Sequence, residues 1–172
     1  MKASVLPIIR DHFDTMRDAR SGKIRVSDLA FFYGIPLLVG VAAYVFSWGV
    51  KGIDNLLAAL SILTGLLFNL LVLLFDTAAR FKGRPGAEAN AENKHKYRLI
   101  HELQANITYT LGVGLAVAII LGACSLAGVQ DARRPWSVLV TILLAHFVLL
   151  LGMLLKRLRS VFLVEFPKLL GA

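Results

Sequence analysis

Four long apolar blocks constrain the fold of this chain more than any other feature of its sequence. They lie at residues 30–48, 53–77, 106–128 and 135–155. A helix needs about 20 apolar residues to cross the roughly 30 Å of hydrocarbon in a bilayer, and each block approaches or exceeds that length. Because the backbone must satisfy its own hydrogen bonds inside lipid, we expect these blocks to be helices rather than strands.

The composition agrees with a membrane protein. Apolar residues make up 57% of the 172 and charged residues only 17%, whereas a soluble domain usually carries about 25% charged residues. A soluble four-helix bundle is the alternative, but blocks as continuous as these leave no polar face for water. The sequence therefore predicts an all-α polytopic membrane protein with four transmembrane helices.

The basic residues predict the orientation in the membrane. Sixteen of the nineteen Lys and Arg residues lie in segments 1–29, 78–105 and 156–172. The other three are Lys51, Arg133 and Arg134. By the positive-inside rule the richer side is cytoplasmic, which predicts a bacterial inner (plasma) membrane protein with both termini cytoplasmic. The net charge of +8 then reflects topology and anionic lipid, and without a recognition motif we do not expect direct binding of nucleic acid.

The cytoplasmic segment 1–29 is predicted to hold an amphipathic helix on the membrane surface. Leu6, Ile9, Phe13 and Met16 recur at three- and four-residue steps, which is typical of a helix with one apolar face. We assign His12, together with the aspartates around it, to the solvated face of that helix. In the first transmembrane helix we expect a kink at Pro36.

The other two cytoplasmic segments are predicted to extend helices beyond the membrane. In the loop 78–105 the composition favours a helix from Ala87 onward, and an apolar stripe there requires a partner helix. The stripe consists of Tyr97, Ile100, Leu103 and Ile107. The basic surface of the loop consists of Arg80, Lys82, Arg84, Lys94, Lys96 and Arg98. The tail 156–172 mixes apolar and charged residues, and we expect it to be amphipathic.

The polar residues within the second helix fall on one stripe. Ser61, Gly65 and Asn69 are spaced by four, and Asp76 follows seven residues after Asn69. Because such spacings share one face of a helix, we expect the four residues to face the protein interior, where polar groups in membranes usually lie.

Matching depth from the cytoplasmic ends predicts two polar layers. Asp76 is expected at the level of Asn106 and Tyr109, and Asn69 at the level of His146. Two interpretations stay open. These residues either hydrogen-bond as packing contacts between helices, with Asp76 paired to Arg80 on its own helix, or line a pore, a proton path or a gate.

A second stripe predicts close packing of the third helix. Gly114, Ala118 and Gly122 repeat at four-residue spacing, and small residues allow helices to approach closely in lipid. Four short-looped helices are a thin scaffold for a transporter, so we expect the protein to act as a homo-oligomer.

Enzyme signatures do not support catalysis. We find no phosphate-binding loop, nucleophile elbow or zinc-protease motif. Asp76 with His101 and Glu102 is the one candidate set for a lipid-modifying enzyme, and no motif supports it. We therefore predict a protein that is not an enzyme and holds no metal or cofactor.

The layout of four helices, short outer loops and basic cytoplasmic segments resembles the small membrane proteins of bacterial antiviral defence. These include the membrane subunit of Kiwa-type systems and certain CRISPR-accessory membrane proteins. The resemblance implies an inner-membrane sensor, or a pore-forming or depolarising effector such as an ion channel, that works with a soluble cytoplasmic partner. A small transporter or an accessory subunit of a larger membrane complex is the alternative.

Overall fold

The computed structural model describes residues 6–16, 26–82, 91–127 and 134–165, with all side chains except those of 81–82, 91–96, 134 and 164–165. Every element within these ranges is a helix. Four helical stretches are long and apolar enough to cross a membrane. They are Val26–Val45, Ile53–Arg80, Tyr97–Leu126 and Pro135–Leu163. The predicted all-α architecture with four such helices is confirmed at this level.

The first of these stretches consists of three consecutive segments. They are α2 (Val26–Leu29), the π-helical turn η1 (Ala30–Gly34) and α3 (Ile35–Val45). Pro36 directly follows the π-helical turn. Because proline has no N–H, the carbonyl of Phe32, four residues earlier, lacks its usual α-helical donor. The irregularity expected at Pro36 therefore takes the form of a π-helical turn.

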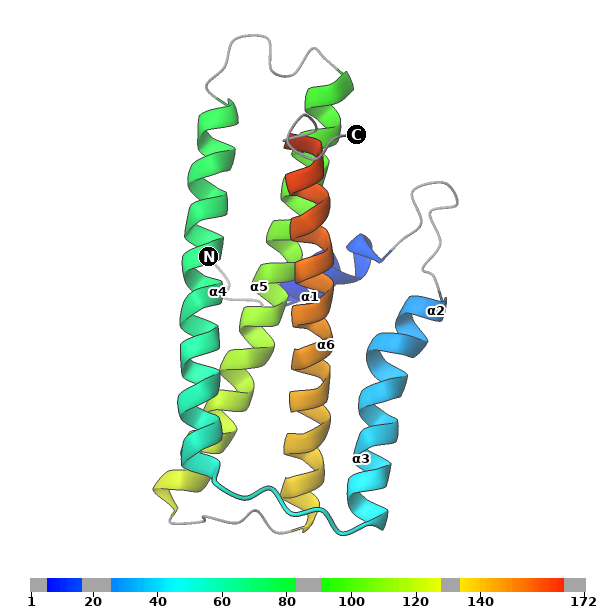
Figure 1. Cartoon of the computed structure of the whole chain (residues 1–172), viewed down its shortest axis with the longest axis vertical. Helices are drawn as coiled ribbons and strands as arrows, with labels where there is room; N and C mark the ends of the chain where they lie inside the picture. Colours follow the sequence, from blue (N-terminus) through cyan, green and yellow to red (C-terminus); the bar gives the residue numbers. More distant parts are fainter. Residues whose placement is uncertain (1–5, 17–25, 83–90, 128–133, 166–172) are drawn as a thin grey trace.

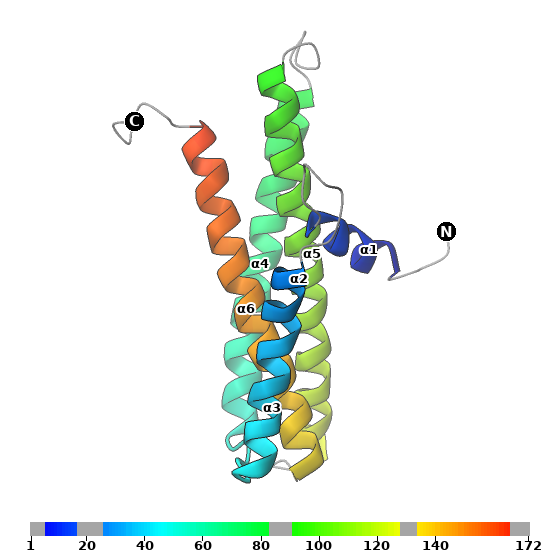
Figure 2. The same ribbon diagram turned by 90° about the vertical axis from the view of Figure 1, so that its right-hand side faces the viewer.

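The remaining helices are α1 (Leu6–Thr15), α4 (Ile53–Lys82), α5 (Ala91–Leu126) and α6 (Arg134–Glu165). The long helices pack in a row, because α4 packs against α5, α5 against α6, and α6 against α3. Figure 1 shows α4 and α3 at the two edges of this row, and Figure 2 shows it turned by 90°. Each edge helix therefore has a broad outer face with no helix of the same chain against it.

The third and fourth apolar stretches continue well into the segments in which the sequence predicted helical extensions. The third starts at Tyr97 rather than at residue 106, and the fourth continues to Leu163 rather than to residue 155. The extension of the third follows from its predicted apolar stripe, because Ile100, Leu103 and Ile107 are buried in the core. Part of the loop predicted at 78–105 thus belongs to the helical bundle.

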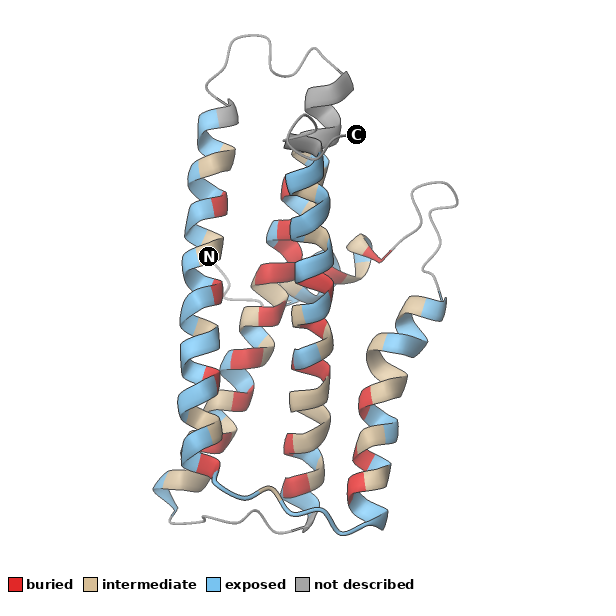
Figure 3. Cartoon of the chain, in the orientation of Figure 1, coloured by how far each residue is buried: buried red, intermediate tan, exposed pale blue. Residues whose placement is uncertain are grey.

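The inner face of α4 is a narrow seam. Ile53, Leu60, Leu67 and Leu74 are spaced by seven residues, and all four are buried. Figure 3 shows buried positions at regular intervals along the side of α4 that faces α5. A seven-residue repeat keeps one line of side chains against a neighbouring helix. The opposite side of α4 is exposed along its length.

Gly114 lies where α5 contacts both α4 and α6. A Cβ atom added there would lie 2.8 Å from Phe147 Cε2 on α6 and 3.1 Å from Thr64 Oγ1 on α4. At Gly122, in contrast, an added Cβ would meet no atom within 4 Å. Residues spaced by four drift around a helix of 3.6 residues per turn, so the far end of the predicted small-residue stripe leaves the contact.

Candidate functional site

A junction of polar side chains lies where α1 crosses the bundle. α1 packs against α5 and lies at a steep angle to the long helices in both views (Figures 1 and 2). Its contact residue on α5 is Asn106, which is 20 residues, or about 30 Å, from the far end of the helix at Leu126. This spacing is close to the roughly 30 Å thickness of hydrocarbon, as expected for a helix that crosses the bundle near one end of its membrane-spanning part.

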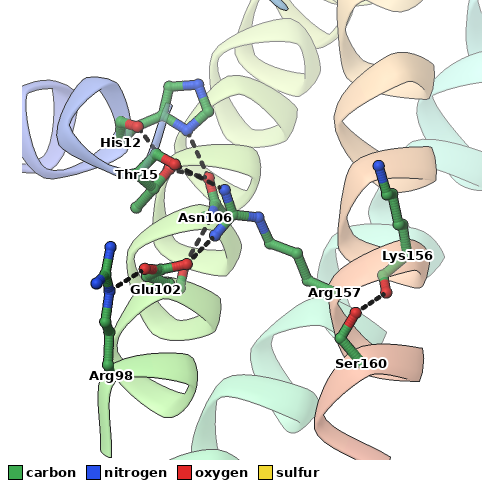
Figure 4. Close-up of polar contacts among 8 residues, drawn as sticks. All are labelled: His12, Thr15, Arg98, Glu102, Asn106, Lys156, Arg157 and Ser160. Atoms are coloured by element: carbon green, nitrogen blue, oxygen red, sulfur yellow. Dashed lines mark hydrogen bonds and ion pairs between the residues drawn. The ribbon is translucent and has the colours of Figure 1, made fainter. Parts of the chain in front are cut away.

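His12 is the centre of the junction. Its side chain is fully buried, and its Nδ1 lies 2.8 Å from Oδ1 of Asn106, which is also fully buried (Figure 4). Asn106 Nδ2 donates to the carbonyl of Glu102 at 2.6 Å, so its Oδ1 is the acceptor and His12 Nδ1 carries the hydrogen. The His12 ring also stacks on Tyr109 with 3.8 Å between ring centroids.

The assignment of His12 to a solvated face is wrong. In a helix, positions three and four apart share a face, so His12 lies with Ile9 and Met16 on the apolar side of α1. Met16 is buried, whereas Asp11 and Asp14 on the other side are exposed. The spacing of His12 from the apolar residues was the signal that could have identified it.

An ion-pair network joins the same junction to α6. Glu102 on α5 accepts from Arg157 Nη1 on α6 at 3.0 Å and from Arg98 Nε on its own helix at 2.9 Å. Arg157 Nη2 also donates to the carbonyl of Thr15, the last residue of α1, at 3.0 Å (Figure 4). A guanidinium there satisfies a free carbonyl at a helix C-terminus and complements its negative dipole end. Arg157 thus ties the end of α1 to both α5 and α6.

A second hydrogen-bonded chain connects the junction to the first span. His146 Nδ1 lies 2.9 Å from the carbonyl of Phe32, the group that Pro36 leaves without a helical donor. That carbonyl can only accept, so His146 Nδ1 carries the hydrogen and His146 Nε2 accepts from the Tyr109 hydroxyl at 3.3 Å. Tyr33 completes the chain, with its hydroxyl 3.3 Å from that of Tyr109. Tyr109 therefore links the chain to the ring of His12.

The structure brings together only part of the predicted polar layers. Asn106, Tyr109 and His146 meet in the junction, as described above. Asn69 and Asp76, however, are exposed on the outer face of α4, and so the predicted pairings of Asn69 with His146 and of Asp76 with Asn106 are wrong for the single chain. The physical reason is that the apolar seam of α4 occupies its inner face. Asp76 forms an ion pair of 2.9 Å with Arg80, which is the pairing expected under the packing interpretation.

The small residues predicted near Asn69 share its outer position. Ser61 and Gly65 are exposed, and Ser61 donates to the carbonyl of Leu57 in its own helix. On α5, Ala118 is half-buried and packs against the apolar core. The first predicted stripe therefore faces outward, whereas the second lies partly within the bundle.

The structure describes only some of the predicted basic-surface residues and candidate catalytic residues. Lys82, Arg84, Lys94 and Lys96 lie outside the described side chains. Asp76, His101 and Glu102 do not gather into one site, because Asp76 pairs with Arg80 and Glu102 with Arg98 and Arg157. Among the described residues, no group of three His, Cys, Asp or Glu side chains is placed to hold a metal ion.

A half-open groove lies between α4 and α5, away from the junction. Its volume is about 480 Å³ and its lining is mostly apolar, with Gln104 and Thr108 as the polar exceptions. None of the residues that line it is charged. The groove therefore lacks the convergent polar groups that the α1 junction has.

The environment of His12 predicts a response to acid. The pKa of His12 is lowered from 6.5 to about 4, mainly because the ring is buried. The hydrogen bond to Asn106 raises this pKa, whereas the charges of His146 and Arg157 lower it. A released α1 would expose His12, whose pKa would return to about 6.5 and which would then bind more protons. Docking of α1 is therefore fully favourable above pH about 6.5 and weakens as the pH falls toward 4.

We expect acidification over this range to destabilise the docked α1 by about 3 kcal/mol, because each pKa unit is worth about 1.4 kcal/mol. Limited proteolysis of α1 in lipid nanodiscs, followed from pH 7.5 to 4, measures the effect. The variant His12→Phe removes both the titrating group and the bond to Asn106, so its α1 should be cleaved at a similar, high rate at every pH. An equal response of the variant and the wild type would contradict the assignment to His12.

Comparison with known protein families, with curated proteins and with solved structures finds no match to this chain.

Proposed function

We propose that this protein is a non-enzymatic membrane sensor in which α1 is a latch on the transmembrane helices. The observation that carries the proposal is the hydrogen bond of the fully buried His12, on a helix outside the four apolar stretches, to Asn106 within one of them. A surface helix held only by apolar contacts would need no such bond. The junction links its position directly to α5 and α6 and, through Tyr109, to Tyr33 of the first apolar stretch.

The distribution of basic residues supports a cytoplasmic position for the latch. α1 belongs to the segment 1–29, which is one of the three segments that hold sixteen of the nineteen Lys and Arg residues. A soluble partner in the cytoplasm of a bacterial cell would thus reach α1 without crossing the membrane. We propose that binding of such a partner, in the setting of antiviral defence, releases α1.

Release of α1 would change the transmembrane helices at defined atoms. When α1 leaves the bundle, the Asn106 carboxamide oxygen loses the His12 N–H donor, and the Arg157 guanidinium loses the Thr15 carbonyl. Tyr109 would also lose its stacked ring, and Tyr109 is bonded to His146. An unpaired polar group in a membrane protein favours rearrangement toward a new partner, so these helices would shift. We propose that this shift is the output, and that it depolarises the membrane.

The test compares two His→Phe variants in cells. His12→Phe removes the bond to Asn106, whereas the matched control His101→Phe changes an exposed histidine of α5. We expect His12→Phe, expressed alone, to lower the membrane potential and slow growth, and His101→Phe to behave like the wild type. A His12→Phe protein that inserts normally, shows a protease-sensitive α1 and leaves potential and growth unchanged would contradict the proposal. That result would favour an accessory subunit of a larger complex.

A further inference from the structure

The outer face of α4 carries a polar group that the single chain does not satisfy. Asn69 is exposed and has no hydrogen-bond partner among the described residues. It lies within the apolar stretch Ile53–Arg80, about 4 Å from the centre of that stretch along the helix axis. Asn106 in the stretch Tyr97–Leu126 differs, because its side chain is fully buried and both its amide oxygen and its amide nitrogen are hydrogen-bonded. Exposure of Asn69 to hydrocarbon would be unfavourable.

Its polar neighbours on α4 are satisfied within the helix. Ser61, Thr64 and Thr77 each donate to a carbonyl four residues earlier. Asp76 is neutralised by Arg80, so the end of this face carries no unpaired charge that would repel a like surface. Asn69 is therefore the group on this face that still needs a partner from outside the chain.

The face around Asn69 also permits a close approach. Gly65 lies one turn away on the same side, and an added Cβ there would meet no atom within 4 Å. The opposite edge of the row differs, because the exposed face of α3 presents apolar side chains that lipid covers well, including Leu37, Leu38 and Val41. The two edges of the row are thus chemically distinct, and only the α4 edge combines a small residue with an unsatisfied amide.

We propose that the α4 face formed by Ser61, Gly65, Asn69 and Asp76 binds the same face of a second copy of this chain. A carboxamide has both donors and an acceptor, so two Asn69 side chains related by a two-fold axis along the membrane normal satisfy one another. Self-complementarity of this kind favours a second copy over a different protein. Interhelical hydrogen bonds and close contact of small residues both drive helix association in lipid. The proposal goes beyond the latch and does not depend on it.

The experiment compares two Gly→Leu variants that the single chain tolerates equally. Gly65 on α4 and Gly112 on α5 are both exposed helical glycines with no atom within 4 Å of an added Cβ. Dimerisation of the full chain is measured by energy transfer between labelled copies as they are diluted in lipid. We expect Gly65→Leu to raise the dissociation constant at least about tenfold and Gly112→Leu to leave it unchanged. Asn69→Leu should raise it about 3- to 20-fold, the range of interhelical hydrogen bonds.

Cross-linking in the Cys124→Ser background checks the face itself. Gly65→Cys and Asn69→Cys should form disulfide-linked dimers, whereas Leu63→Cys, about 160° around the helix from Gly65, should not. A wild-type chain that stays monomeric in lipid, or equal effects of Gly65→Leu and Gly112→Leu, would overturn the proposal and leave lipid or another protein against this face. Because the cellular test of His12→Phe is independent, failure of one proposal is distinguishable from failure of the other.

Discussion

Replacing Asn106 by leucine should release α1 from the bundle and cost about 2–3 kcal/mol of docking free energy. Leucine has nearly the size of asparagine but cannot accept a hydrogen bond. The buried His12 Nδ1–H would therefore lose its acceptor, and the Thr15 hydroxyl, 3.1 Å from the same Asn106 oxygen, would lose a neighbour. A buried polar group without a partner costs about 1–3 kcal/mol. The docking of α1 depends on the contacts of His12 and Thr15 with the Asn106 oxygen.

Amide hydrogen exchange of residues 6–16 in nanodiscs measures this release. A loss of about 2–3 kcal/mol lowers protection by roughly 30- to 150-fold where exchange follows undocking. The matched control is Asn69→Leu, which changes the same residue type at an exposed position without a partner in its chain. Protection of α1 in Asn69→Leu should equal that of the wild type. Equal protection in Asn106→Leu would contradict the role of the His12–Asn106 bond.

Gly114→Leu should destabilise the transmembrane bundle by about 3–4 kcal/mol, at or above the upper end for overpacked cores. Phe147 and Thr64 already fill the space in front of Gly114, so even the first added carbon requires them to move. Phe147 is almost fully buried, and closely packed interiors leave a ring little space to move. We expect the separation of α4, α5 and α6 rather than a local adjustment.

The control for this variant is Gly122→Leu on the same helix. Gly122 belongs to the same small-residue stripe, but an added Cβ there meets no atom within 4 Å. Thermal unfolding in detergent should show a clearly lower midpoint for Gly114→Leu and a midpoint near that of the wild type for Gly122→Leu. Similar midpoints for the two variants would show that Gly114 does not lie at the contact.

The apolar helices could be predicted because lipid imposes a length and a continuous apolar composition on any segment that crosses it. The packing of Ile100, Leu103 and Ile107 followed from their helical spacing in an otherwise charged segment. Gly114 followed from its place in a small-residue stripe. These features depend on neighbours within one helix, and such neighbours are visible in the sequence.

The direction in which α4 faces could not be predicted. Spacing showed that Asn69 and Asp76 share a side with Gly65. The seam that packs against α5, however, consists of residues such as Leu60 and Leu67, and these are the same residue type as the outward-facing leucines of α4. In a membrane both the inside and the outside are apolar, so polarity alone does not identify the inner face. The assumption that polar residues point inward therefore failed for this helix.

The α1 junction was missed for a different reason. His12 and Asn106 are 94 residues apart, and Arg157 lies still further along the chain, so no local pattern connects them. The one signal of burial was that His12 shares a helix face with Ile9 and Met16. The nearby aspartates favoured the solvated assignment instead. Contacts between distant helices depend on packing that a single sequence does not display.

The distance between α1 and α5 in a bilayer tests the central claim, that α1 is held against the long helices. Spin labels at Asp11→Cys and His101→Cys, both exposed positions, are measured in the Cys124→Ser background and diluted with unlabelled protein. At pH 7.5 we predict one short, narrow distance distribution, which becomes broad when Asn106→Leu is added. A broad distribution without that substitution, or no change with it, would contradict the account.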